Sequence, residues 1–297
     1  MKIALCQINP TVGAINQNKK IILETYSRAI DLKADVIVFP ELAIIGYPPQ
    51  DLLLRDRFII NAQNALNEIA QKSTIPVILG NTLIEHNKLY NCAFICENGE
   101  IVSHYKKRLL PTYDVFDEDR YFAAGNKHCI VELAIDGKNT KIGLQICEDL
   151  WDKNYSCDFA KELKESGAEI IINISASPYR VDKLLDRCEL IQTKAKDNSI
   201  PYIYCNLVGA QDELIFDGQS LAYNENGQLI AQGKSFEEEI VMVDLSLNKP
   251  MNLKVVQREE KIYNALVLGI KDYFKKTNHP EAVIGLSGGI DSSLTAS

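Results

Sequence analysis

The sequence predicts a layered α/β fold, with helices that flank either one mixed sheet or two sheets. Short apolar runs alternate along the chain with longer segments whose apolar residues recur at helical spacing. Asn-Gly and Asp-Gly pairs separate several neighbouring runs, as they do in β-hairpins. The 297 residues are 46% hydrophobic and 24% charged, a composition typical of a globular protein with a sizeable core.

The patterns place these elements in order along the chain. We expect strands at 3–8, 35–39, 76–80, 169–175 and 201–207, and helices at 16–34, 56–73, 156–166 and 181–197. We expect hairpins at 89–107, at 129–147 across an Asp136–Gly137 turn, at 220–232, and at a further hairpin-like segment, 238–245. Strands and helices that alternate in this way indicate that the first 245 residues form one α/β domain.

A second domain begins after a linker. Residues 246–257 carry turn residues and weak periodicity, so we interpret them as the linker. Residues 258–276 predict an amphipathic helix, and 282–297 predict a strand, a Gly-rich turn and the start of a helix. One strand and one turn cannot make a parallel-sheet domain, so we expect the sequence to be a fragment of a longer chain.

Charge and cysteine usage exclude some classes of partner. A formal net charge of −8 argues against nucleic-acid or anionic-membrane binding, which needs clustered Lys and Arg. The eight cysteines are scattered, and Cys92 and Cys96 lack the further ligands of a zinc site. No signal peptide and no run of 18 apolar residues is present. We therefore expect a cytoplasmic protein without a metal site.

Three polar residues follow predicted strands: Glu41, Lys107 and Cys147. Chemistry in open α/β folds gathers at such strand ends. A carboxylate can accept a thiol proton, an ammonium can stabilise an oxyanion, and a thiolate can attack a carbonyl carbon. A helix starting after Cys147 would lower the pKa of its thiol. Singly, each residue also fits a packing cysteine or a solvated loop residue.

The segments "FPELAIIGYPPQDLL", "YKKRLLPTYDVFDEDRYFAAG" and "LQICEDLW" together resemble the nitrilase (carbon–nitrogen hydrolase) superfamily. The resemblance covers residues 1–245 and implies a four-layer α-β-β-α sandwich and a thioester intermediate. It makes Glu41 the general base, Lys107 rather than Lys106 the catalytic lysine, and Cys147 the nucleophile. Glu118 matches a second catalytic carboxylate of the family, although its acidic patch also fits a solvated face. Leu109 replaces a histidine common in relatives.

The stretch "IGLSGGIDSS" is not a Walker A loop, because no lysine follows its glycines. It resembles the pyrophosphate-binding loop of ATP pyrophosphatases, which implies ATP binding and a Rossmann-like second domain. The residues that match the loop are Ser287, Gly288, Gly289, Asp291 and Ser292.

A nitrilase-like part followed by this loop resembles the glutamine-dependent NAD synthetases. Amidotransferases with an N-terminal catalytic cysteine are excluded, because Lys2 follows Met1. The resemblance implies that glutamine is hydrolysed and that its ammonia amidates deamido-NAD in a second domain, with ATP and Mg²⁺ used there and no cofactor in the first. It places substrate-binding roles on Tyr113, Phe116, Glu148, Ser177 and Lys183, although Asp182 replaces the glycine that precedes the last of these in the family.

Two other functions fit part of the sequence. The chain is compatible with a free-standing amidase of the nitrilase family, which would not need the Gly-rich loop. It is also compatible with a non-catalytic scaffold, which would leave Cys147 unreactive. For the synthetase interpretation we expect a homo-oligomer without nucleic-acid or membrane partners.

Overall fold

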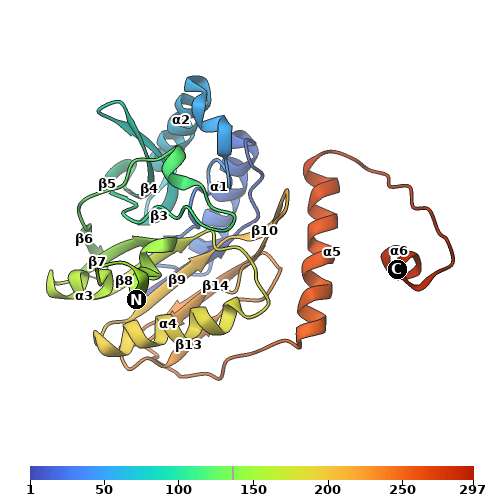
Figure 1. The fold of residues 1–297 in the computed structure, drawn as a ribbon. Coiled ribbons are helices and arrows are strands. Elements are labelled where there is room, and N and C mark those ends of the chain that lie inside the picture. The colour runs from blue at the N-terminus through green and yellow to red at the C-terminus, as the bar shows by residue number, and fades with distance from the viewer. Residues whose placement is uncertain (136) are drawn as a thin grey trace.

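The computed structural model describes residues 1–135 and 137–297. Its body contains two six-stranded sheets (Figure 1). The first has the strand order β14-β1-β2-β3-β4-β5, formed by Glu239–Asp244, Lys2–Gln7, Val36–Val38, Val77–Glu85, Lys88–Glu97 and Glu100–Lys106. The second has the order β13-β12-β9-β8-β7-β6, formed by Leu229–Gln232, Leu221–Tyr223, Tyr202–Asn206, Ile170–Ser175, Lys138–Ile146 and Ile130–Ile135.

The two sheets pack face to face, and helices cover their outer faces. Helices α1 (Ile15–Asp31) and α2 (Asp56–Lys72) pack on the first sheet, while α3 (Phe159–Glu165) and α4 (Lys183–Asp197) pack on the second. Strand β1 shows why: Ile3 and Leu5 belong to the apolar cluster between the sheets, whereas Ala4 and Cys6 face the helices, because successive side chains of a strand point to opposite faces. The four-layer α-β-β-α sandwich is confirmed.

The sequence was misleading at three places. The 238–245 segment forms no hairpin, because β14 crosses to the first sheet and pairs antiparallel with β1. A small hairpin of β10 (Val208–Gln211) and β11 (Leu214–Asp217) was not predicted. The predicted strand at 282–286 is absent from the structure, where these residues are exposed and without regular structure. A lone strand without a neighbouring strand leaves its backbone groups unpaired, which removes the reason to form it.

Short 3₁₀ turns complete the body; they are η1 (Gln50–Leu54), η2 (Glu118–Arg120), η3 (Cys147–Leu150) and η4 (Asp152–Asn154). Strands β6 and β7 pair antiparallel as expected, but Asp136, half of the turn predicted between them, lies outside the described residues. No helix in residues 1–135 and 137–297 is long and apolar enough to span a bilayer.

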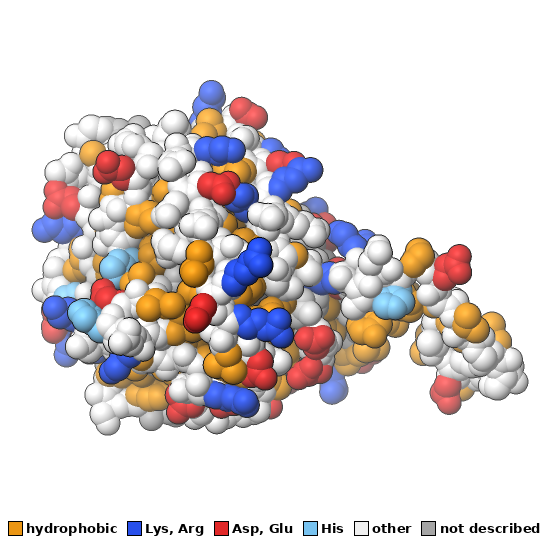
Figure 2. Space-filling view, turned by 90° about the horizontal axis from the view of Figure 1, so that it is seen from above, with side chains coloured by type: hydrophobic (Ala, Val, Ile, Leu, Met, Phe, Trp, Pro, Cys, Tyr) orange, Lys and Arg blue, Asp and Glu red, His pale blue; other side chains and the backbone are white. Residues whose placement is uncertain are grey.

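Helix α5 (Arg258–Lys276) lies beside the β10–β11 hairpin, and α6 (Ile290–Ala296) lies away from the body (Figure 1). Two charged residues of α5, the buried Asp272 and the largely buried Lys276, hold it there. Asp272 accepts hydrogen bonds from Asn9 Nδ2 at 2.7 Å and Ala210 N at 2.8 Å, and Lys276 Nζ donates to Ala210 O at 2.8 Å. Figure 2 shows the C-terminal segment projecting from the body with apolar side chains on its surface.

Candidate active site

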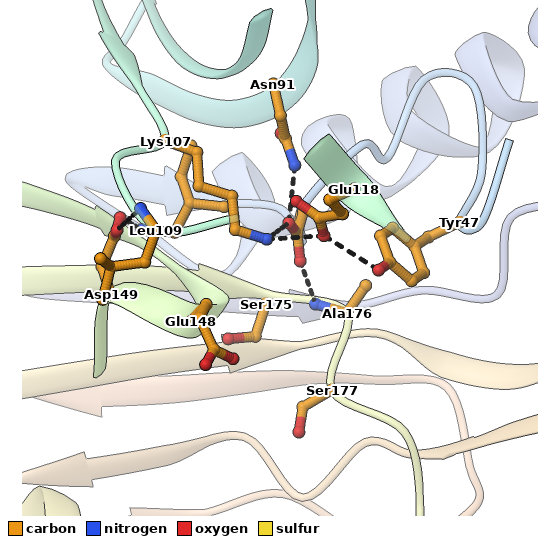
Figure 3. Close-up of polar contacts among 12 residues, drawn as sticks. Tyr47, Asn91, Lys107, Leu109, Glu118, Glu148, Asp149, Ser175, Ala176 and Ser177 are labelled. Carbon is orange, nitrogen blue, oxygen red and sulfur yellow. Dashed lines mark hydrogen bonds and ion pairs between the residues drawn. The ribbon is translucent and has the colours of Figure 1, made fainter. Parts of the chain in front are cut away.

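The three strand ends predicted from the sequence meet between the two sheets. Glu41 follows β2 and Lys107 follows β5, both in the first sheet, whereas Cys147 follows β7 of the second sheet. All three side chains are almost fully buried, at 0%, 1% and 4% exposure. Figure 3 shows Lys107 and Glu118 pointing toward the same place, with Asn91 and Tyr47 beside them. The sheet packing therefore assembles one polar cluster inside an apolar core.

An ammonium between two carboxylates forms the centre of the cluster. Lys107 Nζ lies 2.7 Å from Glu41 Oε1 and 2.7 Å from Glu118 Oε1. Burial on its own lowers the pKa of Lys107, but the charges of Glu118 and Glu41 outweigh it and hold the pKa well above the usual range. Burial raises the pKa of Glu118 to about 7, although Lys107 opposes this shift. The lysine is therefore a fixed cation at neutral pH.

Glu41 is oriented by two further donors. Asn91 Nδ2 donates to its Oε1 at 2.7 Å, and the backbone N–H of Ala176 donates to its Oε2 at 2.9 Å (Figure 3). Tyr47 orients the second carboxylate in the same way, donating its hydroxyl to Glu118 Oε1 at 2.9 Å. The sequence analysis missed Asn91, Ala176 and Tyr47. A signal existed for Asn91, which directly precedes the apolar run "CAFIC". An amide at the start of such a buried strand needs a hydrogen-bond partner inside the fold.

Cys147 occupies an unusual backbone conformation at the end of β7. Its φ of 39° lies in the left-handed region, which non-glycine residues rarely adopt. Burial and the negative charge of Glu41 raise the pKa of its thiol well above the usual range, and Lys107 lowers it by less. The expectation of a helix that lowers this pKa is wrong, because only the short 3₁₀ turn η3 follows. The resting thiol is protonated and needs a base.

Asp149 connects the segments that carry the lysine and the cysteine, and the sequence analysis missed it. This fully buried carboxylate accepts hydrogen bonds of 2.8–3.3 Å from the Tyr105 hydroxyl and from the backbone N–H groups of Arg108, Leu109 and Ile146. Burial raises the pKa of Asp149 to about 6, although these donors oppose the shift. The carboxylate therefore fixes the spacing between the two strand ends.

Replacing Asp149 by asparagine is expected to lower the free energy of unfolding by about 1–3 kcal/mol, because an amide NH₂ would face donors that have no other partner. Chemical denaturation at pH 7 measures the loss. Asp114→Asn, an exposed change on a nearby loop, is the matched control and is expected to change stability by less than about 0.5 kcal/mol. An Asp149→Asn variant as stable as the control would contradict this function of the carboxylate.

Three of the five predicted substrate-binding residues lie together beside the cluster. The Tyr113 hydroxyl is 3.0 Å from both carboxylate oxygens of Glu148, and Tyr155 donates to Glu148 at 3.1 Å. Phe116 packs edge-on against Tyr113, with ring centroids 5.6 Å apart. Burial raises the pKa of Glu148, opposed by the Tyr113 hydroxyl. Tyr113 and Glu148 also line a cavity of about 490 Å³ that extends along α4.

Lys183 and Ser177 approach the site from other elements. Lys183 is the first residue of α4, and its Nζ lies 3.6 Å from the centre of the Trp151 ring. Burial lowers the pKa of Lys183, while the neighbouring Cys147 and Glu148 act in the opposite direction. Ser177 follows β8 and is buried, with its hydroxyl 3.5 Å from Arg187 Nη2. Lys183 is therefore close to Cys147 and Glu148, while Ser177 follows Ala176, whose N–H donates to Glu41.

The predicted ATP loop is not part of this cluster. Ser287, Gly288, Gly289 and Asp291 are exposed, Ser292 is partly exposed, and all five lie at the projecting C-terminal end (Figure 1). The Ser287 and Ser292 hydroxyls are 3.1 Å apart, and Gly288 has a φ of 81° with open space around it. The described ranges contain no group of three or more His, Cys, Asp or Glu residues arranged to hold a metal ion.

Comparisons with known proteins identify relatives over nearly the whole chain. The model of the carbon–nitrogen hydrolase family matches residues 2–252, and the NAD synthase model matches residues 262–297. The chain is 42% identical to a glutamine-dependent NAD(+) synthetase of Synechocystis, over 99% of this chain and 56% of that protein. It is 37% identical to the enzyme of that name from Thermotoga maritima, over 100% of this chain and 57% of that one.

A solved structure shares the fold. The glutamine-dependent NAD+ synthetase from Acinetobacter baumannii, in complex with adenosine diphosphate, superposes with a TM-score of 0.91 at 35% identity. The match covers 99% of this chain and 56% of that one. The chain thus spans about half the length of the relatives it matches.

Proposed function

The chain belongs to the carbon–nitrogen hydrolase family, and from this premise we propose that residues 1–245 form a glutamine amidohydrolase domain. The observation that supports it most is the buried Lys107, held 2.7 Å from both Glu41 and Glu118 beside a protonated Cys147. A buried cation between two carboxylates adds little net stability, because taking these charges out of water is costly. As a site that stabilises developing negative charge, it has a clear chemical use.

In the proposed reaction, Glu41 accepts the Cys147 thiol proton as the sulfur attacks the side-chain amide carbon of glutamine. Lys107 stabilises the oxyanion of the tetrahedral intermediate. The C–N bond then breaks, and the proton held by Glu41 goes to the departing nitrogen, so ammonia leaves and a γ-glutamyl thioester remains. Water then attacks the thioester, and Glu41 accepts a proton from it. The C–S bond breaks, glutamate is released, and the proton passes from Glu41 to the Cys147 sulfur, which restores the thiol.

The second carboxylate, Glu118, supports Lys107 in this scheme rather than reacting itself. Its Oε1 lies 2.7 Å from the ammonium, as Glu41 Oε1 does, and the Tyr47 hydroxyl fixes Glu118 in turn. The lysine is then held in place before the substrate arrives. A preorganised charge of this kind costs no reorganisation at the moment of reaction.

Five residues would hold the amino-acid end of glutamine. Glu148, supported by Tyr113, suits the α-ammonium group, and Lys183 suits the α-carboxylate. Phe116 and Ser177 would line the remaining sides of the glutamine pocket. The carboxylate of Glu148 and the ammonium of Lys183 come from different layers of the fold, which suits a zwitterionic substrate.

For the protein as a whole we propose glutamine-dependent NAD synthetase activity. Residues 246–257 would link the glutaminase domain to an ATP-binding domain that begins at 258–297. There Ser287, Gly288, Gly289, Asp291 and Ser292 would hold the pyrophosphate of ATP, with Mg²⁺, while ammonia amidates deamido-NAD. The match of 262–297 to the NAD synthase model favours this over a free-standing amidase. We also propose a cytoplasmic homo-oligomer.

Glutaminase activity is tested by mass spectrometry and by product release. A diazoketone analogue of glutamine is expected to add once, on Cys147, and excess glutamine is expected to slow the labelling. Ammonia and glutamate are expected to form in equal amounts from glutamine. Ammonia and aspartate are expected to form more slowly from asparagine, which is shorter by one methylene. Labelling at another cysteine, or protection by asparagine equal to that by glutamine, would contradict the proposal.

A further inference from the structure

The short segment Ser175–Ser177 connects the candidate base to the substrate side of the site. It starts at Ser175, the last residue of β8, at the carboxyl end of that strand. Its Ala176 N–H is the donor on Glu41 Oε2, at 2.9 Å, and Ser177 lies next along the chain (Figure 3). The position of this segment therefore sets both the orientation of Glu41 and the place of the Ser177 hydroxyl.

Asn206, at the end of β9, holds the backbone of Ser177 with a single side chain. Its Oδ1 accepts from Ser177 N at 3.0 Å, and its Nδ2 lies 3.4 Å from Ser177 O. Asn206 Nδ2 also donates to Gly218 O at 2.9 Å and lies 3.3 Å from Asp217 Oδ1. The amide is fully buried. It thus fixes the Ser175–Ser177 segment against the loop that follows β11.

Arg187 of α4 and Asp217 of β11 complete the arrangement. Arg187 Nη2 lies 3.2 Å from Asp217 Oδ1 and 3.5 Å from the Ser177 hydroxyl, and Nη1 lies 3.4 Å from Gly218 O. Arg187 and Asp217 are 0% and 1% exposed. A fully buried ion pair is often no more stabilising than apolar residues of the same volume, so its value lies in fixing geometry.

We propose that Arg187, Asn206 and Asp217 form a positioning brace for the Ser175–Ser177 segment. The brace, defined by these three residues, keeps the Ala176 N–H on Glu41 and the Ser177 hydroxyl toward the substrate. The residues act through the segment and not on the reacting atoms. The inference rests on the proposed glutaminase function. It adds three residues that fix the positions of Glu41 and the Ser177 hydroxyl relative to each other.

The test uses Arg187→Lys, which retains the positive charge beside Asp217. A single ammonium cannot also reach the Ser177 hydroxyl and Gly218 O, because lysine lacks the planar fork of arginine. We expect kcat/KM for glutamine to fall about tenfold, the equivalent of one charge-assisted hydrogen bond. Most of the loss is expected in kcat, because Glu41 loses a well-placed N–H donor and is held less firmly for accepting the Cys147 proton.

The matched control is Arg180→Lys, since Arg180 pairs with Asp186 on the exposed face of the same region. It is expected to leave kcat and KM unchanged. Asn206→Ser provides a second variant that keeps the Arg187–Asp217 pair and removes the amide from Ser177. It is expected to lower kcat in the same way, so it tests the brace even if Arg187→Lys does not fold.

Alkylation of Cys147 by iodoacetamide separates the brace from the proposed function, because it needs the base but not glutamine. Alkylation of Cys147 that is slower than in wild type in both folded brace variants, and unchanged in Arg180→Lys, would support the brace, even if wild-type protein failed to hydrolyse glutamine. That failure would overturn only the glutaminase proposal. Folded variants in which Cys147 is alkylated at the wild-type rate would overturn the brace.

Discussion

Replacing Cys147 by alanine is expected to lower kcat/KM for glutamine by more than about 10⁴-fold, because loss of a nucleophile removes the covalent route. Neither Glu41 nor Lys107 can substitute for it, since both stay bound to each other at 2.7 Å. The Cys147 side chain contributes little to packing beyond its small volume, so the variant is expected to fold. Ammonia release from glutamine measures the loss, and thermal unfolding checks the fold.

Cys157→Ala is the matched control. Cys157 lines the 490 Å³ cavity beside Glu148, and burial raises the pKa of its thiol as it does for Cys147, but it has no contact with Lys107 or Glu41 among the hydrogen bonds and ion pairs of the described residues. Its replacement is expected to change the rate by less than about twofold. A Cys147→Ala variant that still hydrolyses glutamine would assign the reaction to another group.

The positions of the strand ends could be predicted because each element is encoded locally. Buried strands such as 35–39 are continuous apolar runs, and a polar residue just after one is visible in the sequence. Resemblance to a family then grouped Glu41, Lys107 and Cys147, which are far apart along the chain. The structure brings Lys107 and Glu41 into contact and places Cys147 next to both charges.

The parts that could not be predicted depend on contacts between distant segments. Strand β14 joins the first sheet by pairing with β1, more than two hundred residues earlier, and nothing in its own pattern specifies that partner. Likewise Asn91 and Asp149 look like ordinary polar residues in the sequence. Their function follows from what burial forces on them, since a buried amide or carboxylate needs partners that only the assembled fold supplies.

Replacing Lys107 by methionine is expected to lower kcat at least about 10²-fold, as removal of one oxyanion-stabilising donor does. It would also leave Glu41 and Glu118 buried without their cation, which is expected to cost about 3–5 kcal/mol of unfolding free energy. Because the pKa of Lys107 is raised by these carboxylates, its stabilising contribution is fully present below about pH 10.4 and is lost only above that. The whole loss therefore appears at neutral pH.

A second variant distinguishes catalysis from folding. Adding Glu118→Gln to Lys107→Met removes one of the two unpaired carboxylates, so much of the lost stability is expected to return. The oxyanion would still lack a cation, so kcat is expected to remain low. Denaturation and single-turnover hydrolysis on the same samples measure the two effects. Recovery of both stability and rate would mean that Lys107 serves only to neutralise the carboxylates.

Lys106→Met is the control, because the two lysines are neighbours with different surroundings. Lys106 is part of β5, pairs with Glu85 and lies 4.3 Å from the centre of the Tyr90 ring. Alternation along the strand turns its side chain away from Lys107, so its removal is expected to change kcat by less than about twofold. Equal losses in the two single variants would contradict this register. In that case the reaction would depend on the structure at the end of β5, and not on the ammonium that contacts Glu41 and Glu118.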